Sequence, residues 1–305
     1  MNSSPGASLD LGTNSTRFLL VRSPDCGFSR ERILERDSVV TRLGEAVETS
    51  GRLSDSAMQR VIEQVEDYDL RVRQQGGRWV DAIATHACRK APNGDRFLRR
   101  LQEILSISPR VVSGSQEARL IYHGVRASVS GHEIGRVMDI GGGSTEWIRK
   151  HENEIDYHSF PIGVVTLTEL FLRGNHWEPE MIKKARNRIR SHLPNRRGEG
   201  DLVVVGGTGT TLAAMKLELD QYDSAAVHGQ QLTLSEIERL RNTVLDRPVN
   251  QLVEHPMIQP GREDVMMAGV LILEEFARFS TANHVIVSDF GPLAGTFEEI
   301  RMNCG

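Results

Sequence analysis

The sequence predicts an α/β protein that is built from two copies of one domain. Residues 9–18 can be laid over residues 138–147 without a gap, so that an aspartate, a glycine, a serine and a threonine coincide. The order of expected strands and helices in the first half of the chain also starts again in the second half. A duplicated domain accounts for both observations.

In the first copy, an apolar strand carries Asp10 near its end and a turn with one glycine follows. Glycine allows a tight turn, and the N–H and hydroxyl groups beside it can bind phosphate oxygens. The carboxylate of Asp10 can hold a divalent cation directly or through water. The candidate phosphate-binding residues of this copy are Gly12, Thr13, Asn14, Ser15 and Arg17.

The rest of the first half alternates strands and helices. Ser54 is expected to cap a helix whose apolar face runs from position 57 to 72 at steps of four and three. Strands expected at 79–84 and 110–113 are each followed by a helix. With a further strand at 31–42, the order is three strands, then helix, strand, helix, strand and helix.

The second copy begins at a strand that carries Asp139 near its end. Three glycines and two hydroxyl residues follow, which predicts a second phosphate loop made of Gly141, Gly142, Gly143, Ser144 and Thr145. Strands are expected at 135–140, 145–150, 155–160, 202–205 and 284–288, and helices at 164–173, at 178–193, after Thr210, after Leu234 with Ser235 as its cap, at 263–279 and at 294–302.

A third glycine loop follows the strand at 202–205 and opens a helix. Its candidate phosphate-binding residues are Gly207 and Thr208, because the backbone donors and dipole at a helix start favour an anion. Long loops are expected at 223–229 and 247–261.

Composition limits the classes of function. A length of 305 residues suits two domains of ordinary size, and a net charge of -4 argues against a nucleic-acid partner. The three cysteines form no C-x-x-C pair, so no zinc site is expected. The longest apolar run, at 265–273, is far shorter than the ~20 residues of a membrane span, and residues 1–7 lack the features of a signal peptide. A cytoplasmic protein without a membrane partner is therefore expected.

Short motifs along nearly the whole chain resemble those of the exopolyphosphatase/guanosine pentaphosphate phosphohydrolase family. They are 10–15, 84–85 with Arg89 and Asn93, 113–114 with 117–120, 139–146, 161–163, 207–208 with Thr211, 227–229, Arg262 with Asp264 and 268–269, and 288–289 with Gly291 and Gly295. The resemblance implies an actin-like, ribonuclease-H-like fold of two βββαβαβα domains, with the active site in the cleft between them and loops 12–16 and 141–145 facing one another. The domains are then expected at 1–124 plus about 289–305, and at 125–288.

The resemblance also implies roles for charged residues. Glu117, at the start of a helix, is the candidate catalytic group that activates water, and Glu146 is a second candidate that binds metal or water. Asp139 is the first choice for holding Mg²⁺ or Mn²⁺, and Asp10 is the second. Arg89 is expected to clamp a phosphate.

Purely structural roles remain open for the same residues. Asp10 and Asp139 can cap hairpin turns, and Glu117 can be an ordinary first-turn glutamate that the helix dipole favours. Glu146 can be a strand residue that faces solvent, and Arg89 can form a surface salt bridge.

The chain departs from the family at 291–295, where Gly-Pro-Leu-Ala-Gly replaces the usual Gly-Leu-Arg-Glu-Gly. An arginine and an acidic residue are missing, which affects anion contacts or domain closure there. The chain also lacks the helical C-terminal domain of long relatives, so a shorter channel is expected. Arg262 and His228 match family positions, but the sequence assigns them no chemistry.

The leading expectation is a homodimeric exopolyphosphatase that prefers polyphosphate of short to medium length. Guanosine pentaphosphate hydrolysis is the alternative within the family, but aromatic residues are only 5% of the chain and no stacking pair flanks the loops. A sugar kinase of the same fold is a third possibility, although the chain has neither the Asn-Asp base motif nor the cysteine-rich zinc site typical of that class. A non-catalytic phosphate or nucleotide sensor is the fourth, and the presence of Glu117 argues against it.

Overall fold

The structure is a computed structural model that describes residues 4–151 and 154–304. Residues 1–3, part of the segment expected to carry no signal peptide, lie outside these ranges. The chain divides into two compact units: unit 1 is Met1–Ser130 with Phe290–Gly305, and unit 2 is Gly131–Asp289. The division therefore comes later than the expected position between residues 124 and 125.

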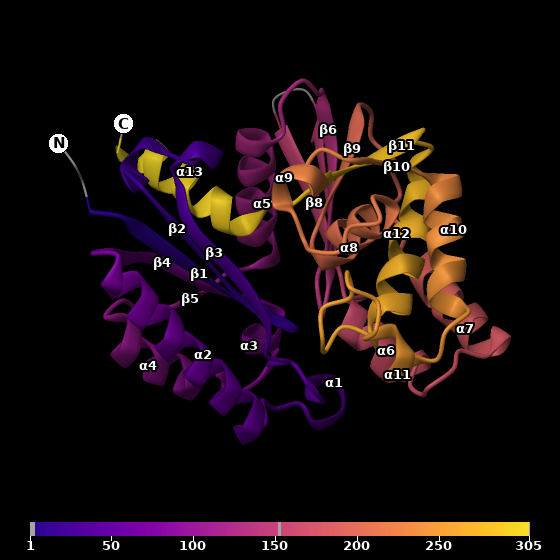
Figure 1. Ribbon diagram of the computed structural model, residues 1–305, viewed down its shortest axis with the longest axis horizontal. Coiled ribbons are helices and arrows are strands. Elements are labelled where there is room, and N and C mark those ends of the chain that lie inside the picture. Colours follow the sequence, from indigo (N-terminus) through magenta and orange to yellow (C-terminus); the bar gives the residue numbers. More distant parts are fainter. Residues whose placement is uncertain (1–3, 152–153, 305) are drawn as a thin grey trace. The chain divides into compact units, whose positions relative to one another are not determined.

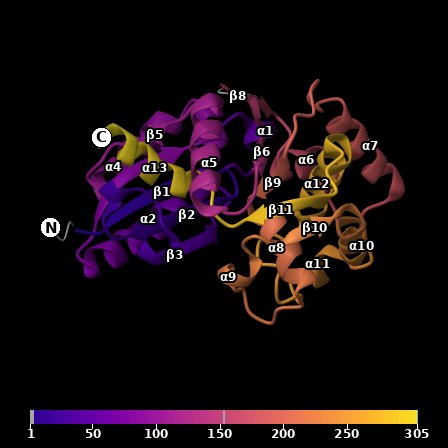
Figure 2. The same cartoon turned by 90° about the horizontal axis from the view of Figure 1, so that it is seen from above.

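The division comes later because helix α5 (Gly114–Ser128) belongs wholly to unit 1, where it packs along α13 (Pro292–Cys304). Figure 2 shows these two helices side by side, with α13 in yellow. A side-chain carbon added at Gly124 would collide with the carbonyl oxygen of Gly291, and one added at Gly295 would collide with the carbonyl oxygen of Leu120. Gly124 of α5 and Gly295 of α13 thus allow the two helix backbones to touch.

Unit 1 contains a five-stranded mixed sheet in the order β3-β2-β1-β4-β5. Neighbours β1, β2 and β3 are antiparallel, whereas β4 and β5 continue parallel to β1. The carboxyl ends of β1, β4 and β5 consequently lie at one edge of the sheet. The strands are β1 (Gly6–Leu11), β2 (Ser15–Val21), β3 (Ile33–Val40), β4 (Arg78–Ala84) and β5 (Arg110–Val111).

Side-chain alternation along β2 decides which helices cover each face of this sheet. Leu20 lies in a core shared with α2 (Asp55–Gln74) and α4 (Gly94–Leu105), whereas Leu19 packs with Phe297 of α13. Adjacent strand residues point to opposite faces, so α2 and α4 cover one face and α13 the other, as Figure 1 shows. The expected cap of α2 is confirmed, because the Ser54 hydroxyl accepts the N–H of Ala57 at 3.1 Å. The remaining helices of unit 1 are α1 (Val47–Ser50) and α3 (His86–Lys90), with short 3-10 turns at Pro24–Cys26 and Arg30–Arg32.

Unit 2 contains a six-stranded sheet in the order β10-β11-β9-β6-β7-β8. Apart from β10, it repeats unit 1: three antiparallel neighbours, β8, β7 and β6, are followed by β9 and β11 in parallel with β6. The predicted duplicated α/β fold is thus confirmed. The strands are β6 (Ile134–Ile140), β7 (Thr145–His151), β8 (Glu154–Phe160), β9 (Asp201–Val205), β10 (Gln231–Thr233) and β11 (His284–Ser288).

Four expectations for unit 2 are corrected. Helix α8 begins at Gly207 rather than after Thr210, and the cap of α10 is Thr233, whose hydroxyl accepts the N–H of Glu236, rather than Ser235. The stretches 223–229 and 247–261, expected as loops, contain the short helices α9 and α11, and strand β10 is an addition to the expected strands. The helices of this unit are α6 (Val164–Phe171), α7 (Pro179–Arg190), α8 (Gly207–Lys216), α9 (Ser224–Val227), α10 (Leu234–Leu245), α11 (Val249–Leu252) and α12 (Met266–Ser280).

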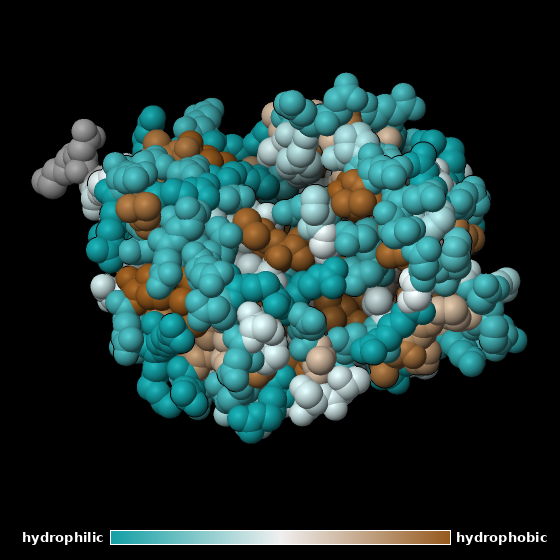
Figure 3. All heavy atoms as spheres, turned by 60° about the horizontal axis from the view of Figure 1, so that its bottom comes forward, coloured by the Kyte–Doolittle hydropathy of each residue, from teal (hydrophilic) through white to brown (hydrophobic). Residues whose placement is uncertain are grey.

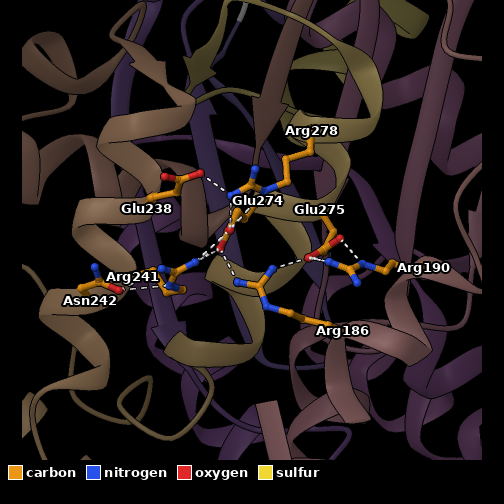
Figure 4. Close-up of polar contacts among 8 residues, drawn as sticks. All are labelled: Arg186, Arg190, Glu238, Arg241, Asn242, Glu274, Glu275 and Arg278. Atoms are coloured by element: carbon orange, nitrogen blue, oxygen red, sulfur yellow. Dashed lines mark hydrogen bonds and ion pairs between the residues drawn. The ribbon is translucent and has the colours of Figure 1, made fainter. Parts of the chain in front are cut away.

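Helix α12 forms the centre of the core of unit 2 and is apolar on nearly all sides, as a buried helix should be. It also carries Glu274, whose carboxylate is completely buried. Arg186 of α7 and Arg241 of α10 each contact this carboxylate at 2.8 Å, and Arg278 contacts it at 3.0 Å (Figure 4). The carboxylate of Glu274 is thus paired with three arginines, and these ion pairs connect α12 to α7 and α10.

No helix in the described ranges combines the length and apolar character that crossing a membrane requires. On the face that Figure 3 shows, apolar residues form separate patches among polar ones, which is ordinary for a protein surface.

Candidate functional site

The turn that joins the first two strands is built in the same way in both units. In unit 1 the N–H of Gly12 donates to the carbonyl oxygen of Ser15 at 3.1 Å, and in unit 2 the N–H of Gly141 donates to that of Ser144 at 3.0 Å. A side-chain carbon at Gly12 or Gly141 would lie 2.8 or 2.9 Å from the same oxygen, which is too close. Backbone bonds therefore close both turns, and glycine is needed at the same position in each.

The loop of unit 2 is fixed by the start of helix α6. Val164 and Val165 donate their N–H groups to the carbonyl oxygens of Gly141 and Gly142 at 2.9 and 2.8 Å. The Thr166 hydroxyl donates to the carbonyl oxygen of Gly143 at 3.2 Å. These bonds use carbonyl oxygens, so the N–H groups of Gly142 and Gly143 stay out of the bracing and can serve an anion, whereas that of Gly141 closes the turn.

The loop of unit 1 is fixed by a segment after β3. Gly44 donates its N–H to the carbonyl oxygen of Thr13 at 2.8 Å, and Thr41 and Arg42 donate to that of Asn14 at 3.1 and 2.9 Å. As in unit 2, the bonds that fix the loop are accepted by carbonyl oxygens of the loop. Both predicted loops thus hold a fixed backbone shape by different means.

Asp10 and Arg17 are opposite one another on β1 and β2, and their side chains form an ion pair at 3.5 Å. Asp10 is buried, and this burial raises the pKa of its carboxyl group, while Arg17 partly offsets the rise. Oδ1 of Asp10 has no hydrogen-bond partner among the described residues. A buried oxygen of this kind suits a bound cation or a donor from a ligand.

Asp139 lies on β6 between Glu146 of β7 and Val205 of β9. Glu146 is only 1% exposed, so it does not face solvent. Its Oε1 accepts the hydroxyls of Ser144 and Ser159 at 2.8 and 2.7 Å. The two acidic candidates of unit 2 are therefore neighbours on adjacent strands, and one of them is held by serine hydroxyls.

The third loop lies against Asp139. Gly206 has a left-handed φ of 99°, and a side-chain carbon there would be 3.1 Å from Oδ1 of Asp139 and 2.9 Å from the carbonyl oxygen of Ile140. A side-chain carbon at Gly207 would collide with the guanidinium group of Arg262. Arg262 is a residue to which the sequence assigned no chemistry, and the structure places it over the start of α8.

Two predicted phosphate-binding hydroxyls are used inside the protein. Thr145 donates its hydroxyl to the carbonyl oxygen of Ile162 at 2.5 Å. The hydroxyl of Thr208 lies against Gly269 of α12, where an added side-chain carbon would collide with it. The side chains of both residues are therefore directed into their unit, and Thr208 keeps a backbone N–H in the first turn of α8 that suits an anion.

Glu117 and Arg89 come together in unit 1. Nη1 of Arg89 lies 3.3 Å from Oε2 of Glu117 and donates to the carbonyl oxygen of Val112 at 2.5 Å. Ser113 and Gln116 cap α5 reciprocally, with bonds of 3.2 and 2.9 Å. The cap does not use the side chain of Glu117, so this buried carboxylate is not needed as a capping group.

In each unit, the candidate site residues follow the carboxyl ends of the parallel strands, at the same edge of the sheet. Loop 12–14, the helix with Arg89 and the helix with Glu117 follow the parallel strands β1, β4 and β5. Loop 141–143 and the Gly206–Gly207 turn follow the parallel strands β6 and β9. In open α/β sheets, ligands bind beyond the carboxyl ends of the strands, so each edge is a candidate binding surface of its unit.

The acidic residues fit a metal ion that is only partly held by protein. Within residues 4–151 and 154–304, no group of three His, Cys, Asp or Glu side chains could hold a metal by itself. The partnerless oxygen of Asp10 and the space that Gly206 leaves beside Asp139 suit a cation near either carboxylate. Mg²⁺ commonly uses one or two carboxylates and takes its other ligands from water and phosphate.

Comparison with known proteins gives matches over nearly the whole chain. The model of the Ppx/GppA phosphatase family matches residues 24–299. Exopolyphosphatase 2 of Mycobacterium tuberculosis is 29% identical over 286 residues, which cover 89% of each protein. A bifunctional 3-dehydroquinate synthase/phosphatase of Fusobacterium nucleatum is 27% identical over 307 residues, which cover 96% of this chain and 46% of that protein. The crystal structure of the Aquifex aeolicus Ppx/GppA family member has 28% identity and a TM-score of 0.82, with 99% of each chain covered.

Proposed function

The chain belongs to the Ppx/GppA phosphatase family, and from this premise we propose that it is an exopolyphosphatase that releases terminal orthophosphate from inorganic polyphosphate. As a family member it is a hydrolase of phosphoanhydride bonds. The observation that carries the proposal is the turn repeated in both units, in which Gly12 and Gly141 each donate to a serine carbonyl. Two loops of one geometry suit a substrate with repeated phosphate groups. The name of the Mycobacterium tuberculosis relative supports the same substrate.

Phosphate binding is assigned to backbone N–H groups and arginines. The N–H groups of residues 13–15 and 142–144, with those of Gly207 and Thr208, donate to phosphate oxygens, whereas those of Gly12 and Gly141 close the turns. Arg89 lies beside Glu117 and adds a charged donor. Arg17 is paired with Asp10, as Arg89 is with Glu117, and adds a second charged donor.

Hydrolysis requires a water molecule in line with the scissile bond and a group that takes its proton. We assign the second task to Glu117: as the water oxygen bonds to the terminal phosphorus, the carboxylate accepts the proton and the shortened chain departs with the bridging oxygen. Arg89 holds this carboxylate through the contact at 3.3 Å. Glu146, whose Oε1 accepts two serine hydroxyls, would bind metal or water in unit 2.

Asp139 is the first choice for holding Mg²⁺ or Mn²⁺, and Asp10 is the second. When bound, the cation neutralises charge on phosphate oxygens and helps to orient them. The remaining expectations from the sequence are part of the same proposal: a cytoplasmic homodimer that prefers polyphosphate of short to medium length.

The test is release of orthophosphate by the purified protein with Mg²⁺. Its substrates are polyphosphates of several lengths, guanosine pentaphosphate, and ATP with a panel of sugars. Polyphosphate should give the highest kcat/KM. If guanosine pentaphosphate exceeds polyphosphate of every length by about tenfold or more, which is about 1.4 kcal/mol of transition-state stabilisation, the protein is a guanosine pentaphosphate phosphohydrolase instead. Sugar-dependent ATP consumption identifies a kinase, and no turnover of any substrate identifies a sensor.

A further inference from the structure

Segment 41–53 forms a brace behind the phosphate loop of unit 1. Besides its backbone bonds to Thr13 and Asn14, the hydroxyl of Thr41 bonds to that of Thr16 at 2.8 Å. Gly44 lies so close to Thr13 that an added side-chain carbon would collide with the methyl group of that threonine. The brace and the loop are therefore in direct contact, and a shift of the brace must move the loop.

The same brace is tied to helix α3 by the carboxylate of Glu48. Its Oε2 lies 2.5 Å from Nζ of Lys90, and its Oε1 lies 3.3 Å from Nε2 of His86. Burial tends to raise the pKa of Glu48, but the hydrogen bonds from Lys90 and His86 outweigh it and hold this pKa below its ordinary value. The carboxylate is thus charged at neutral pH and can bridge both partners.

The two partners of Glu48, His86 and Lys90, lie on either side of Arg89 in the sequence of α3. A second tie joins the brace to the loop after α3, because the side chain of Asn93, the residue before α4, accepts the N–H of Leu53 at 3.1 Å and donates to the carbonyl oxygen of Leu53 at 2.9 Å. The brace therefore touches the phosphate loop at one end and α3 at the other. No hydrogen bond or ion pair of Glu48 to a group assigned to substrate occurs in the described part of the chain.

We propose that Glu48 is a positioning residue that fixes the distance between loop 12–14 and Arg89 by joining the brace to α3. This inference rests on the proposed function of that site. It explains why an acidic side chain that is only 19% exposed is placed where it can bridge Lys90 and His86.

The kinetic test compares Glu48→Gln with the matched control Glu45→Gln. Glu45 is on the same brace, but its partner is Arg60 of α2 and its side chain is 53% exposed, so its ion pair contributes little. Glu48→Gln should lower kcat/KM for polyphosphate about tenfold, as displaced binding groups do, and Glu45→Gln should stay within about twofold of the wild type.

A double-mutant cycle shows whether Glu48 acts through Arg89. Coupled residues have non-additive effects, so in the Arg89→Ala background Glu48→Gln should change kcat/KM by less than about twofold. Multiplication of the two single effects would overturn the proposal. A kcat/KM of Glu48→Gln equal to that of the wild type would overturn it as well.

Hydrogen exchange separates this inference from the choice of substrate, because it needs no turnover. In Glu48→Gln, peptides covering 41–50 and 86–90 should lose protection together, whereas Glu45→Gln should leave 86–90 unchanged. Loss of protection confined to 41–50 would overturn the proposed connection. If the wild type does not hydrolyse polyphosphate but the joint loss occurs, only the proposed function fails.

Discussion

Nη1 of Arg89 lies 3.3 Å from Oε2 of Glu117, and the same nitrogen donates to the carbonyl oxygen of Val112. The two charged residues come from different helices, α3 and α5, which follow adjacent parallel strands. Arg89 thus forms a salt bridge, as its structural alternative supposes, and its partner is a buried carboxylate. This pair is the part of unit 1 on which the proposed chemistry depends most.

Glu117→Gln tests the role in water activation. Glutamine keeps the size of the side chain and one oxygen but cannot take the proton of water, so kcat should fall by ~10²–10⁴. KM and the melting temperature should change little, because Ser113 and Gln116 still cap α5. The measurement is steady-state phosphate release together with thermal denaturation.

Arg119→Gln is the control for this substitution, since Arg119 is exposed on the same helix. It should retain near wild-type kcat. If Glu117→Gln keeps more than about half of the wild-type activity, far from a general-base effect, Glu117 serves only its ion pair with Arg89.

Asp139→Asn tests the metal assignment. The amide lacks the negative charge that attracts a cation, so the Mg²⁺ concentration for half-maximal activity should rise and excess Mg²⁺ should restore part of the rate by mass action. Titration of activity with Mg²⁺ measures the effect. Asp10→Asn is the comparison, and a larger shift in that variant would make Asp10 the principal ligand.

The turns of both loops could be predicted from the sequence because their cause is local. Gly12 and Gly141 are needed where the backbone folds onto a serine carbonyl three positions later, and the repeat in sequence shows the repeat in structure. The strands flanking each turn follow from runs of apolar residues. The duplicated topology follows from their order.

Groups brought together over long sequence distances could not be predicted in this way. Arg262 lies over Gly207 because the loop before α12 returns to the start of α8, and no local pattern encodes that return. The cap of α10 was misplaced because Thr233 and Ser235 have the same chemistry, and only the backbone shows which hydroxyl accepts the N–H of Glu236. The short strand β10 likewise depends on its pairing with β11.

Gly206→Ala tests the close approach of the third loop to Asp139. Alanine at a φ of 99° is strained by about 1–3 kcal/mol, and its side chain would also press on Ile140 and Asp139. Both the melting temperature and activity at limiting Mg²⁺ should fall.

Gly229→Ala is the matched control, because Gly229 also has a left-handed φ, 85°, with no atom within 4 Å of an added side-chain carbon. It should show the strain alone, and an equal loss of activity in both variants would contradict the prediction.

The buried ion pairs of Glu274 lead us to expect that the stability of unit 2 depends on pH. Burial tends to raise the pKa of Glu274, but the bonds from Arg186, Arg278 and Arg241 outweigh it, so its pKa in the folded protein is lowered. A lowered pKa stabilises the fold fully above the pKa of an unfolded glutamate, about 4.3. This stabilisation is lost as the pH falls from there through the folded value.

The measurement compares melting temperatures of the wild type and Glu274→Gln from neutral pH down to about pH 2, so that it extends below the pKa of free glutamate, about 4.3, into the range where the stabilisation is lost. At neutral pH, Glu274→Gln should be less stable by about 3–5 kcal/mol, since it leaves arginines around a buried site without their anion. This difference should shrink on acidification, because the wild-type carboxylate loses its advantage as it becomes protonated. Glu238→Gln removes only an exposed partner of Arg278 and should cost at most about 1 kcal/mol at either pH. A gap between wild type and Glu274→Gln that stays constant or widens toward acid would show that the fold does not depend on this charge.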